Sequence, residues 1–155
     1  MDSRMYPVGS GSPKSRPMSG LEVDFGVLKI QRTRVTAAQV NAGFTLLPAI
    51  PGVKWRITDA SLIAYGNAAT TATSVDLLGT KAGAASRPLV GAVSSLAQSV
   101  LLRMGAAGMV ILADGASFTA HDNNTKISVV KQSGGSSLGG ATGIDVILSY
   151  VADQA

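Results

Sequence analysis

The residue types that most often carry catalysis are few in this chain and are not spaced for it. The sequence has one histidine, His121, and its neighbour Asp122 is a carboxylate. A Ser-His-Asp relay needs a histidine that a carboxylate orients, but adjacent residues of a strand point to opposite faces. No G-x-S-x-G nucleophile motif is present. We therefore expect His121 to be a histidine beside a turn and not part of an acyl-transfer site.

Paired carboxylates and metal ligands are no better supported. Asp76 and Asp145 lie in expected strands, where we expect them to face solvent or a subunit interface. A glycosidase needs two carboxylates at a set separation, and aromatic residues, which stack on sugars, make up only 5% of the chain. Asp122-Asn123-Asn124 lacks the spacing of an EF-hand loop, and no cysteine is present. We expect no catalytic residue, no metal and no cofactor.

Nucleotide and nucleic-acid binding are also poorly matched. The glycine clusters are not followed by the Gly-Lys-Ser/Thr of a phosphate-binding loop. Lys29, Arg32 and Arg34 lie close together on one expected strand, but single-strand binders interleave such charges with stacking aromatics. Trp55, the single tryptophan, is expected in the core. Direct nucleic-acid binding is therefore not the expected function, and the basic strand is expected to meet an acidic neighbouring subunit or water.

Composition points towards association. The chain has 155 residues, 46% of them hydrophobic and 14% charged, with a net charge of +4. Globular proteins average about 25% charged residues. The low charge indicates either surface hidden against other subunits or a surface of small uncharged polar residues.

The sequence has no membrane-spanning segment of the helical kind. No apolar run of about 18 residues occurs, so we expect no membrane contact. The N-terminus lacks the apolar core of a secretory signal, which predicts synthesis in a cytoplasm without secretion by that route.

The first twenty residues differ from the rest. Eleven of them are Gly, Ser or Pro, and such a segment buries too little apolar area to offset its ordering entropy. We predict an extended N-terminal arm over 1–20 and a β domain over 21–155. Either the arm is an inert terminus or it orders on a neighbouring subunit. On the second reading the contact residues of the arm are Arg4, Met5, Tyr6, Lys14, Arg16 and Met18.

The rest of the chain predicts short strands separated by turn residues. The clearest is Val53 to Tyr65, where apolar and polar residues alternate until Asp59 predicts a bulge. Other strands are expected at 27–35, 43–48, 70–78, 100–104, 109–112, 117–120, 126–131 and 144–151. The segment 70–78 is expected to pair with the strand before it, and 80–97 to be loop with a possible short helix at 89–95.

Eight or nine short strands at regular spacing predict an all-β fold, an antiparallel β-sandwich or jelly roll with an extended N-terminal arm. No repeat of fixed period is present, which argues against a solenoid or propeller.

Three segments carry a family resemblance: 43–60 (GFTLLPAIPGVKWRITDA), 112–118 (LADGASF) and 143–151 (GIDVILSYV). They resemble head decoration, or cement, proteins of tailed bacteriophages of the siphophage type, over about residues 43–152. The resemblance implies a homotrimer that binds the outer surface of the head and bridges neighbouring major capsid subunits. Such a protein resists the pressure of packaged DNA. The contact residues would then include Lys29, Arg32 and Arg34 besides those of the arm.

Other functions remain open at this point. A small jelly-roll coat protein that encloses a genome itself has this length, although the arm is only weakly basic for neutralising nucleic acid. A glycan-binding tail or receptor module would need surface tryptophan or tyrosine. An enzyme on a β scaffold lacks a catalytic constellation in the sequence.

Overall fold

The computed structural model describes residues 16–18, 21–70, 74–92, 96–105, 109–110, 119–132 and 138–155. They form two main antiparallel sheets and a small hairpin. The four-stranded sheet runs in the order β3 (Leu28–Thr36), β11 (Gly143–Gln154), β5 (Val53–Tyr65) and β8 (Leu101–Arg103). The five-stranded sheet runs β4 (Phe44–Leu47), β10 (Ile127–Lys131), β6 (Ser74–Lys81), β7 (Ala84–Ala92) and β9 (Met109–Val110). The hairpin pairs β1 (Arg16–Met18) with β2 (Leu21–Val23).

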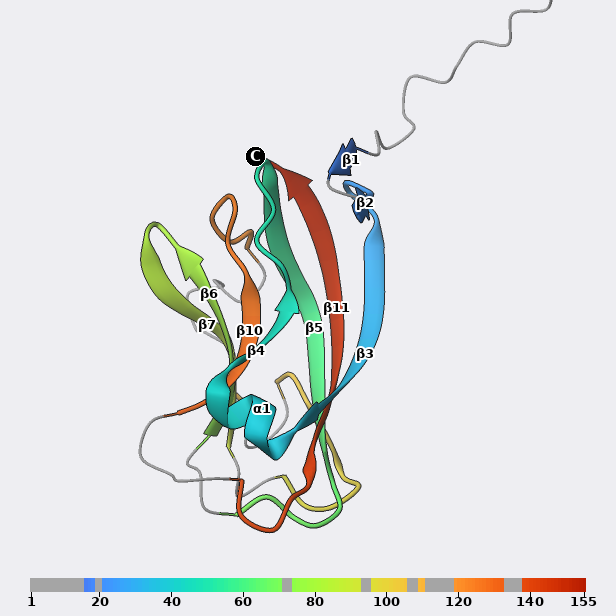
Figure 1. The fold of residues 1–155 in the computed structure, drawn as a ribbon, viewed down its shortest axis with the longest axis vertical. Helices are drawn as coiled ribbons and strands as arrows, with labels where there is room; N and C mark the ends of the chain where they lie inside the picture. The colour runs from blue at the N-terminus through green and yellow to red at the C-terminus, as the bar shows by residue number, and fades with distance from the viewer. Residues whose placement is uncertain are drawn as a thin grey trace, which may run out of the picture.

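The two sheets stack as layers of a sandwich, with the long strands β3, β11 and β5 side by side in one layer (Figure 1). This confirms the all-β sandwich that the strand pattern predicts. The core lies between the layers. In the four-stranded sheet, alternate residues of β5 and β11 point into it because successive side chains of a strand alternate in direction. The buried residues of these two strands include Val53, Trp55, Ile57, Leu62, Ile144, Val146 and Leu148.

β5 has the bounds that the sequence predicts, and the expected bulge is present. The pairing of β5 with β11 shifts register between Ser149 and Tyr150, which lie opposite Asp59 and Ile57. The extra residue keeps Trp55 and Ile57 on the inner face before the bulge and Ala60 and Leu62 on it afterwards. A bulge of this kind strengthens the local twist of a strand, and it sits in the middle of the longest strand of the sandwich.

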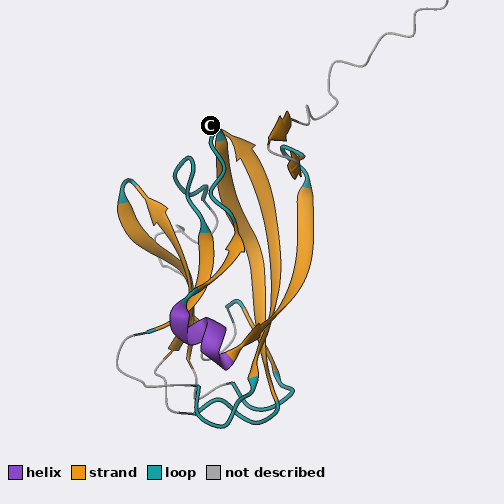
Figure 2. Cartoon of the chain, viewed as in Figure 1, coloured by secondary structure: helices purple, strands orange, loops and turns teal. Residues whose placement is uncertain are grey.

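A short helix, α1 (Ala37–Ala42), links the two layers and was not predicted from the sequence. It crosses from the end of β3 to β4 (Figure 2). Thr36 and Gln39 form a capping box: the Thr36 side chain accepts from the Gln39 N–H, and the Thr36 N–H donates to the Gln39 Oε1. Val40 anchors the helix to the core with no exposed surface. The cap therefore fixes where the chain leaves the edge strand β3.

Removal of this cap should be measurable. We expect Thr36→Ala to lower the free energy of unfolding by about 1 kcal/mol, because the side-chain oxygen satisfies a helix N–H that is otherwise free. Thr36→Ser keeps the oxygen and is the matched control. Urea denaturation followed by circular dichroism would measure both, and equal stability of the two variants would contradict a capping role.

Two sequence predictions for the five-stranded sheet are wrong. Residues 84–92 form strand β7 and not a loop followed by a helix. β7 is held by a hairpin with β6, whose turn residues Ala82 and Gly83 have positive φ values of 52° and 75°. β6 begins at Ser74, and its partners are β10 and β7, not β5. The small residues of β7 hide its strand character because they have low β propensity.

Several expectations lie partly or wholly outside the described residues. Residues 1–15 and the turn at Asp114-Gly115 are among them, as is half of the strand expected at 117–120. Within the described part of the chain, none of the helices has the length and apolar character needed to cross a bilayer.

Candidate interaction face

One face of the four-stranded sheet points away from the core and is partly open to solvent. Cross-strand neighbours on this outer face form rows that run from β3 to β8. One row aligns Arg32 with Ile147, Ser61 and Arg103. The next aligns Arg34 with Asp145, Ile63 and Leu101. We call the outward side chains of β3, β11, β5 and β8 the outer face.

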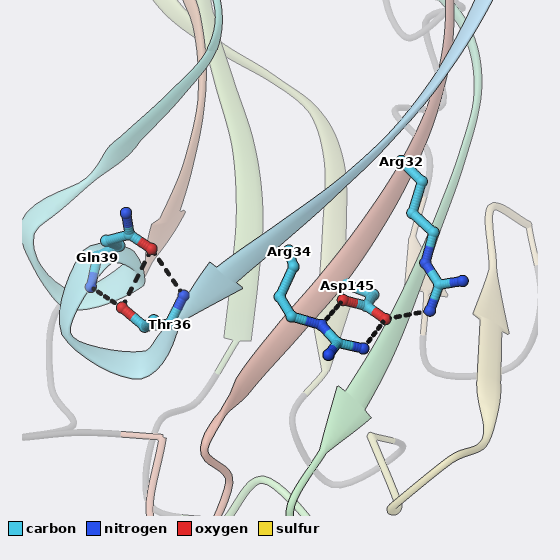
Figure 3. Close-up of polar contacts among 5 residues, drawn as sticks. All are labelled: Arg32, Arg34, Thr36, Gln39 and Asp145. Atoms are coloured by element: carbon cyan, nitrogen blue, oxygen red, sulfur yellow. Dashed lines mark hydrogen bonds and ion pairs between the residues drawn. The ribbon is translucent and has the colours of Figure 1, made fainter.

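The centre of the outer face is a carboxylate held by two guanidinium groups. Asp145 lies in β11, and its side chain is only 2% exposed. The Arg34 Nε donates to Oδ1 at 2.8 Å and its Nη2 to Oδ2 at 3.0 Å, while the Arg32 Nη2 also donates to Oδ2. Figure 3 shows the two arginines approaching the carboxylate from opposite sides. Asp145 is therefore buried beneath its partners, which corrects the expectation that it faces solvent or a subunit interface.

The electrostatics of this cluster follow from its geometry. Hydrogen bonds from Arg34, followed by those from Arg32, stabilise the charged carboxylate and lower the pKa of Asp145 to about 2, against the opposing effect of burial. The same hydrogen bond and charge raise the pKa of Arg34. Both arginine side chains remain about 60% exposed, at 60% and 62%. One buried negative charge thus orients two exposed positive charges, which leaves a net charge of +1.

Arg34 is fixed by a second contact. Its guanidinium carbon lies 4.5 Å from the centroid of the Tyr65 ring, a cation–π distance. A guanidinium that is stacked and doubly hydrogen bonded has lost most of its rotamer freedom. A partner that binds it therefore meets a side chain that is already ordered, and less entropy is lost on association.

Apolar side chains lie beside this charged centre. Leu28 is 57% exposed and Ile30 is 68% exposed, although both belong to a regular strand. Val27 before β3, and Val100 and Leu101 at β8, are also exposed. The exposed apolar residues thus gather at the two edges of the sheet. Apolar surface combined with ordered arginines is typical of protein interfaces.

A second ion pair occupies the far end of the outer face. The Arg56 Nε donates to the Asp153 Oδ2 at 2.8 Å across β5 and β11. Its side chains are 44% and 21% exposed, so solvent screens this pair more than it screens Asp145. Lys54 lies opposite Asp153 in the register of β5 and β11, so a second cation stands beside this pair.

His121 and Asp122 are separated in function, although they are sequence neighbours. His121 is buried, and its Nδ1 donates to the Thr80 carbonyl at 3.2 Å, so the described partners leave the buried Nε2 without a hydrogen bond. The Asp122 carboxylate instead accepts the N–H groups of Ala82 and Gly83 at 2.8 and 2.9 Å. Asp122 therefore holds the turn between β6 and β7, and His121 supports the core beneath Gly79.

Burial of His121 makes the fold sensitive to mild acid. Burial lowers the pKa of His121, so the unfolded chain binds a proton at higher pH than the folded chain does. Stability should therefore fall as the pH drops below the unfolded value of about 6.5. We expect His121→Leu to remove this slope between pH 7 and 5.5, as measured by urea denaturation at each pH. An unchanged slope would show that other groups control the transition.

The remaining polar clusters do not form a reaction site among the described residues. Asp76 is buried and pairs with the Arg87 Nε at 3.1 Å. This corrects the expectation that Asp76 faces solvent or a subunit interface. Burial raises the pKa of Asp76.

A cavity of about 340 Å³ is lined by Thr80, Thr125 and Ser128. The hydroxyls of Thr80 and Thr125 are hydrogen bonded to each other at 2.6 Å. In the part of the chain described, no three His, Asp or Glu side chains converge to hold a metal.

The structure brings together only part of the predicted contact set. Arg32 and Arg34 share the Asp145 cluster, and Lys29 pairs with Asp24 at 2.8 Å near the start of β3. The backbone of 16–18 forms β1. The other predicted contact residues, Arg4, Met5, Tyr6 and Lys14, lie outside the described residues.

Sequence reasoning missed three residues of the outer face. The sequence around Asp145 could have indicated its role. It is a single acid between Ile144 and Val146 in an apolar strand, and a buried acid needs a partner. Leu28 and Ile30 belong to an expected strand, but their exposure depends on which side of the sheet the core covers. That information lies in the pairing with β11 and not in β3 itself.

Comparison with known proteins does not identify a family for this chain. No protein-family model matches the chain, and no curated protein matches it. A solved structure, the capsid of Ralstonia phage GP4, matches with 17% identity and a TM-score of 0.48. The match covers 92% of this chain and 93% of that chain. A likeness at this level assigns neither a family nor a function.

Proposed function

We propose that this chain is a virion structural protein that binds the outer surface of a phage head and cements neighbouring major capsid subunits. The outer face is the main support for this proposal, because ordered arginines lie beside the exposed Leu28 and Ile30 on a sheet. Such a face suits binding to another protein, because apolar contact supplies affinity and ordered charge supplies orientation. The bound form would be a homotrimer.

The sequence resemblance supports the same function. The segments that resemble phage head decoration proteins include all of β4 and most of β5 and β11. β5 and β11 form the middle of the four-stranded sheet and carry much of the outer face. The residues that suggest the family therefore support the surface that we propose for binding. The virion would be assembled in the host cytoplasm, with this protein on the outside of the head.

The alternative of a glycan-binding module loses support among the described aromatics. Trp55 is only 4% exposed. Tyr65 is covered by Arg34, and Tyr150 packs against Trp55 with ring centroids 5.6 Å apart. Sugar sites present ring faces to solvent, whereas Trp55 is buried and Tyr65 and Tyr150 are half-buried and already make a ring contact each.

Solution mass and head binding test the proposal. The purified protein would be measured by light scattering and then mixed with empty heads that lack it, taken from the phage that encodes the chain. We expect a trimer that sediments with the heads and raises their melting temperature, because a ligand that binds only the assembled lattice stabilises that lattice. A monomer that stays in the supernatant would contradict the cement function. Spontaneous shells would identify a coat protein instead.

The arm provides a separate prediction. We expect deletion of residues 2–20 to abolish head binding while the remaining chain stays folded and trimeric, because the arm would lie along capsid subunits and many copies would multiply its contacts. Circular dichroism and light scattering are the folding controls. Normal decoration by the shortened protein would mean that the arm does not bind the head.

A further inference from the structure

One edge of the four-stranded sheet is the complete strand β3. β3 pairs with β11 over nine residues without a register shift. Among the described residues it has no strand partner on the other side. Natural edge strands usually carry a proline, a bulge or an inward-pointing charge that blocks further pairing. β3 has no proline and no bulge, its two arginines fold back onto Asp145, and its remaining charge, Lys29, pairs with Asp24 near the start of the strand.

The main-chain groups that face this edge can be assigned. Ala37, just after β3, donates its N–H to the Thr142 carbonyl beside β11 at 2.9 Å. In an antiparallel pair, alternate residues direct their main-chain groups to the same neighbour. Even-numbered residues of β3 therefore direct theirs away from β11. Thr36 fits this alternation, because its N–H is taken by the Gln39 side chain. The edge thus offers the N–H and C=O groups of Leu28, Ile30, Arg32 and Arg34.

The same four residues carry the exposed side chains. Leu28 and Ile30 form an apolar half of the edge, and Arg32 and Arg34 form a basic half. A strand added here would place its alternate side chains opposite these four. Acidic side chains opposite the arginines would meet guanidinium donors that Asp145 leaves unused.

The N-terminal segment of another copy is a poor candidate for the added strand, because residues 1–16 hold three basic residues and one acid.

We propose that β3 binds an extended acidic segment of the shell protein by antiparallel strand addition; the assignment of this segment to the shell rests on the function proposed above. The segment carries two acidic residues at alternate positions, followed by two apolar residues at alternate positions. Main-chain hydrogen bonds hold it, and the arginines set its direction and register. Strand addition of this type takes affinity from the main chain and specificity from alternate side chains.

A synthetic peptide tests the edge without any phage component. The probe is a nine-residue peptide with two glutamates and then two valines at alternate positions and threonines between them. We expect it to slow hydrogen exchange at the amides of Leu28, Ile30, Arg32 and Arg34 in the full-length protein. A peptide with lysines in place of glutamates should bind about tenfold more weakly. A peptide N-methylated along its pairing edge should not bind. Equal binding of all three peptides, or no protection of these amides, would overturn the proposal.

Head binding tests the source of the segment. Ile30→Pro removes an outward N–H, which an edge strand tolerates because that group makes no ladder bond. Ile30→Thr keeps the N–H and is the matched control. We expect the proline variant to bind heads at least about tenfold more weakly than the control, with an unchanged melting temperature of the free protein.

The possible outcomes separate the two proposals. Unchanged head binding by Ile30→Pro would overturn strand addition and leave the cement function intact. Failure of the unsubstituted protein to bind heads would contradict the cement function and the shell as the source, and the peptide result would then decide what the edge accepts. A drop in solution mass on Ile30→Pro would overturn the proposal, because a second copy would then occupy the edge.

Discussion

Replacing Trp55 with alanine is expected to lower the free energy of unfolding by about 4 kcal/mol. The side chain is 4% exposed and belongs to the hydrophobic core. Its Nε1 donates to the Pro48 carbonyl at 2.8 Å, and its ring meets Tyr150 edge-on at an interplanar angle of 84°. Alanine removes the ring contacts, leaves a cavity and deprives the carbonyl of its donor.

The matched control for this substitution is Trp55→Phe. Phenylalanine keeps most of the apolar volume and the edge-on contact but cannot donate to Pro48, so we expect a loss of about 1–2 kcal/mol. Urea denaturation should be followed by circular dichroism, because Trp55 is the only tryptophan and its fluorescence is lost with it. Similar losses in the two variants would show that the hydrogen bond, and not the packing, dominates.

Replacing Asp145 with asparagine is expected to cost about 2 kcal/mol at neutral pH and to remove an acid transition. The folded-state pKa of about 2 lies below the unfolded value of about 3.9. A depressed carboxyl pKa contributes stability above the unfolded pKa, and this contribution disappears as the pH falls through the folded pKa. The unsubstituted protein should therefore lose about 2 kcal/mol between pH 5 and pH 2 at this site, whereas the variant should not.

Asp153→Asn provides the matched control for Asp145. It removes the carboxylate of the other ion pair on the same strand, but that pair is more exposed, so we expect a loss below about 1 kcal/mol. Urea denaturation of both variants at neutral pH and near pH 2.5 would separate them. Equal effects would show that burial of Asp145 adds nothing to its ion pairs.

The sequence predicts the strands well where hydrophobic alternation is strong and punctuated. β5 is the best case, because Val53, Trp55 and Ile57 alternate with polar residues after a Pro-Gly turn. β7 is the opposite case: its alanine, serine, glycine and proline residues carry little alternation, and pairing with β6 makes them a strand. The helix α1 is only six residues long, too short for periodicity to reveal, although its Thr36-x-x-Gln39 cap is a readable signal.

The sequence predicts the basic residues of the candidate site but not the acid that binds them. The basic residues of β3 are visible as a cluster in the sequence, which predicts that they meet an acidic neighbouring subunit or water. Their internal partner was not visible, because Arg32 and Asp145 are 113 residues apart and nothing in one sequence specifies which strands pair. The same long-range pairing buries Asp145, orders Arg34 and leaves Leu28 and Ile30 exposed.

The separation between β3 and β11 also matters while the chain is being made. β3 leaves the ribosome before β11, its only described strand partner, which follows more than 100 residues later. At a typical rate of about 5–20 residues per second, both sides of β3 stay open for roughly 5–20 seconds. During this time the apolar start of β3, at Leu28 and Ile30, has no strand beside it to limit its contact with other chains. Chaperones that bind extended apolar segments are therefore expected to act on this protein before its sheet closes.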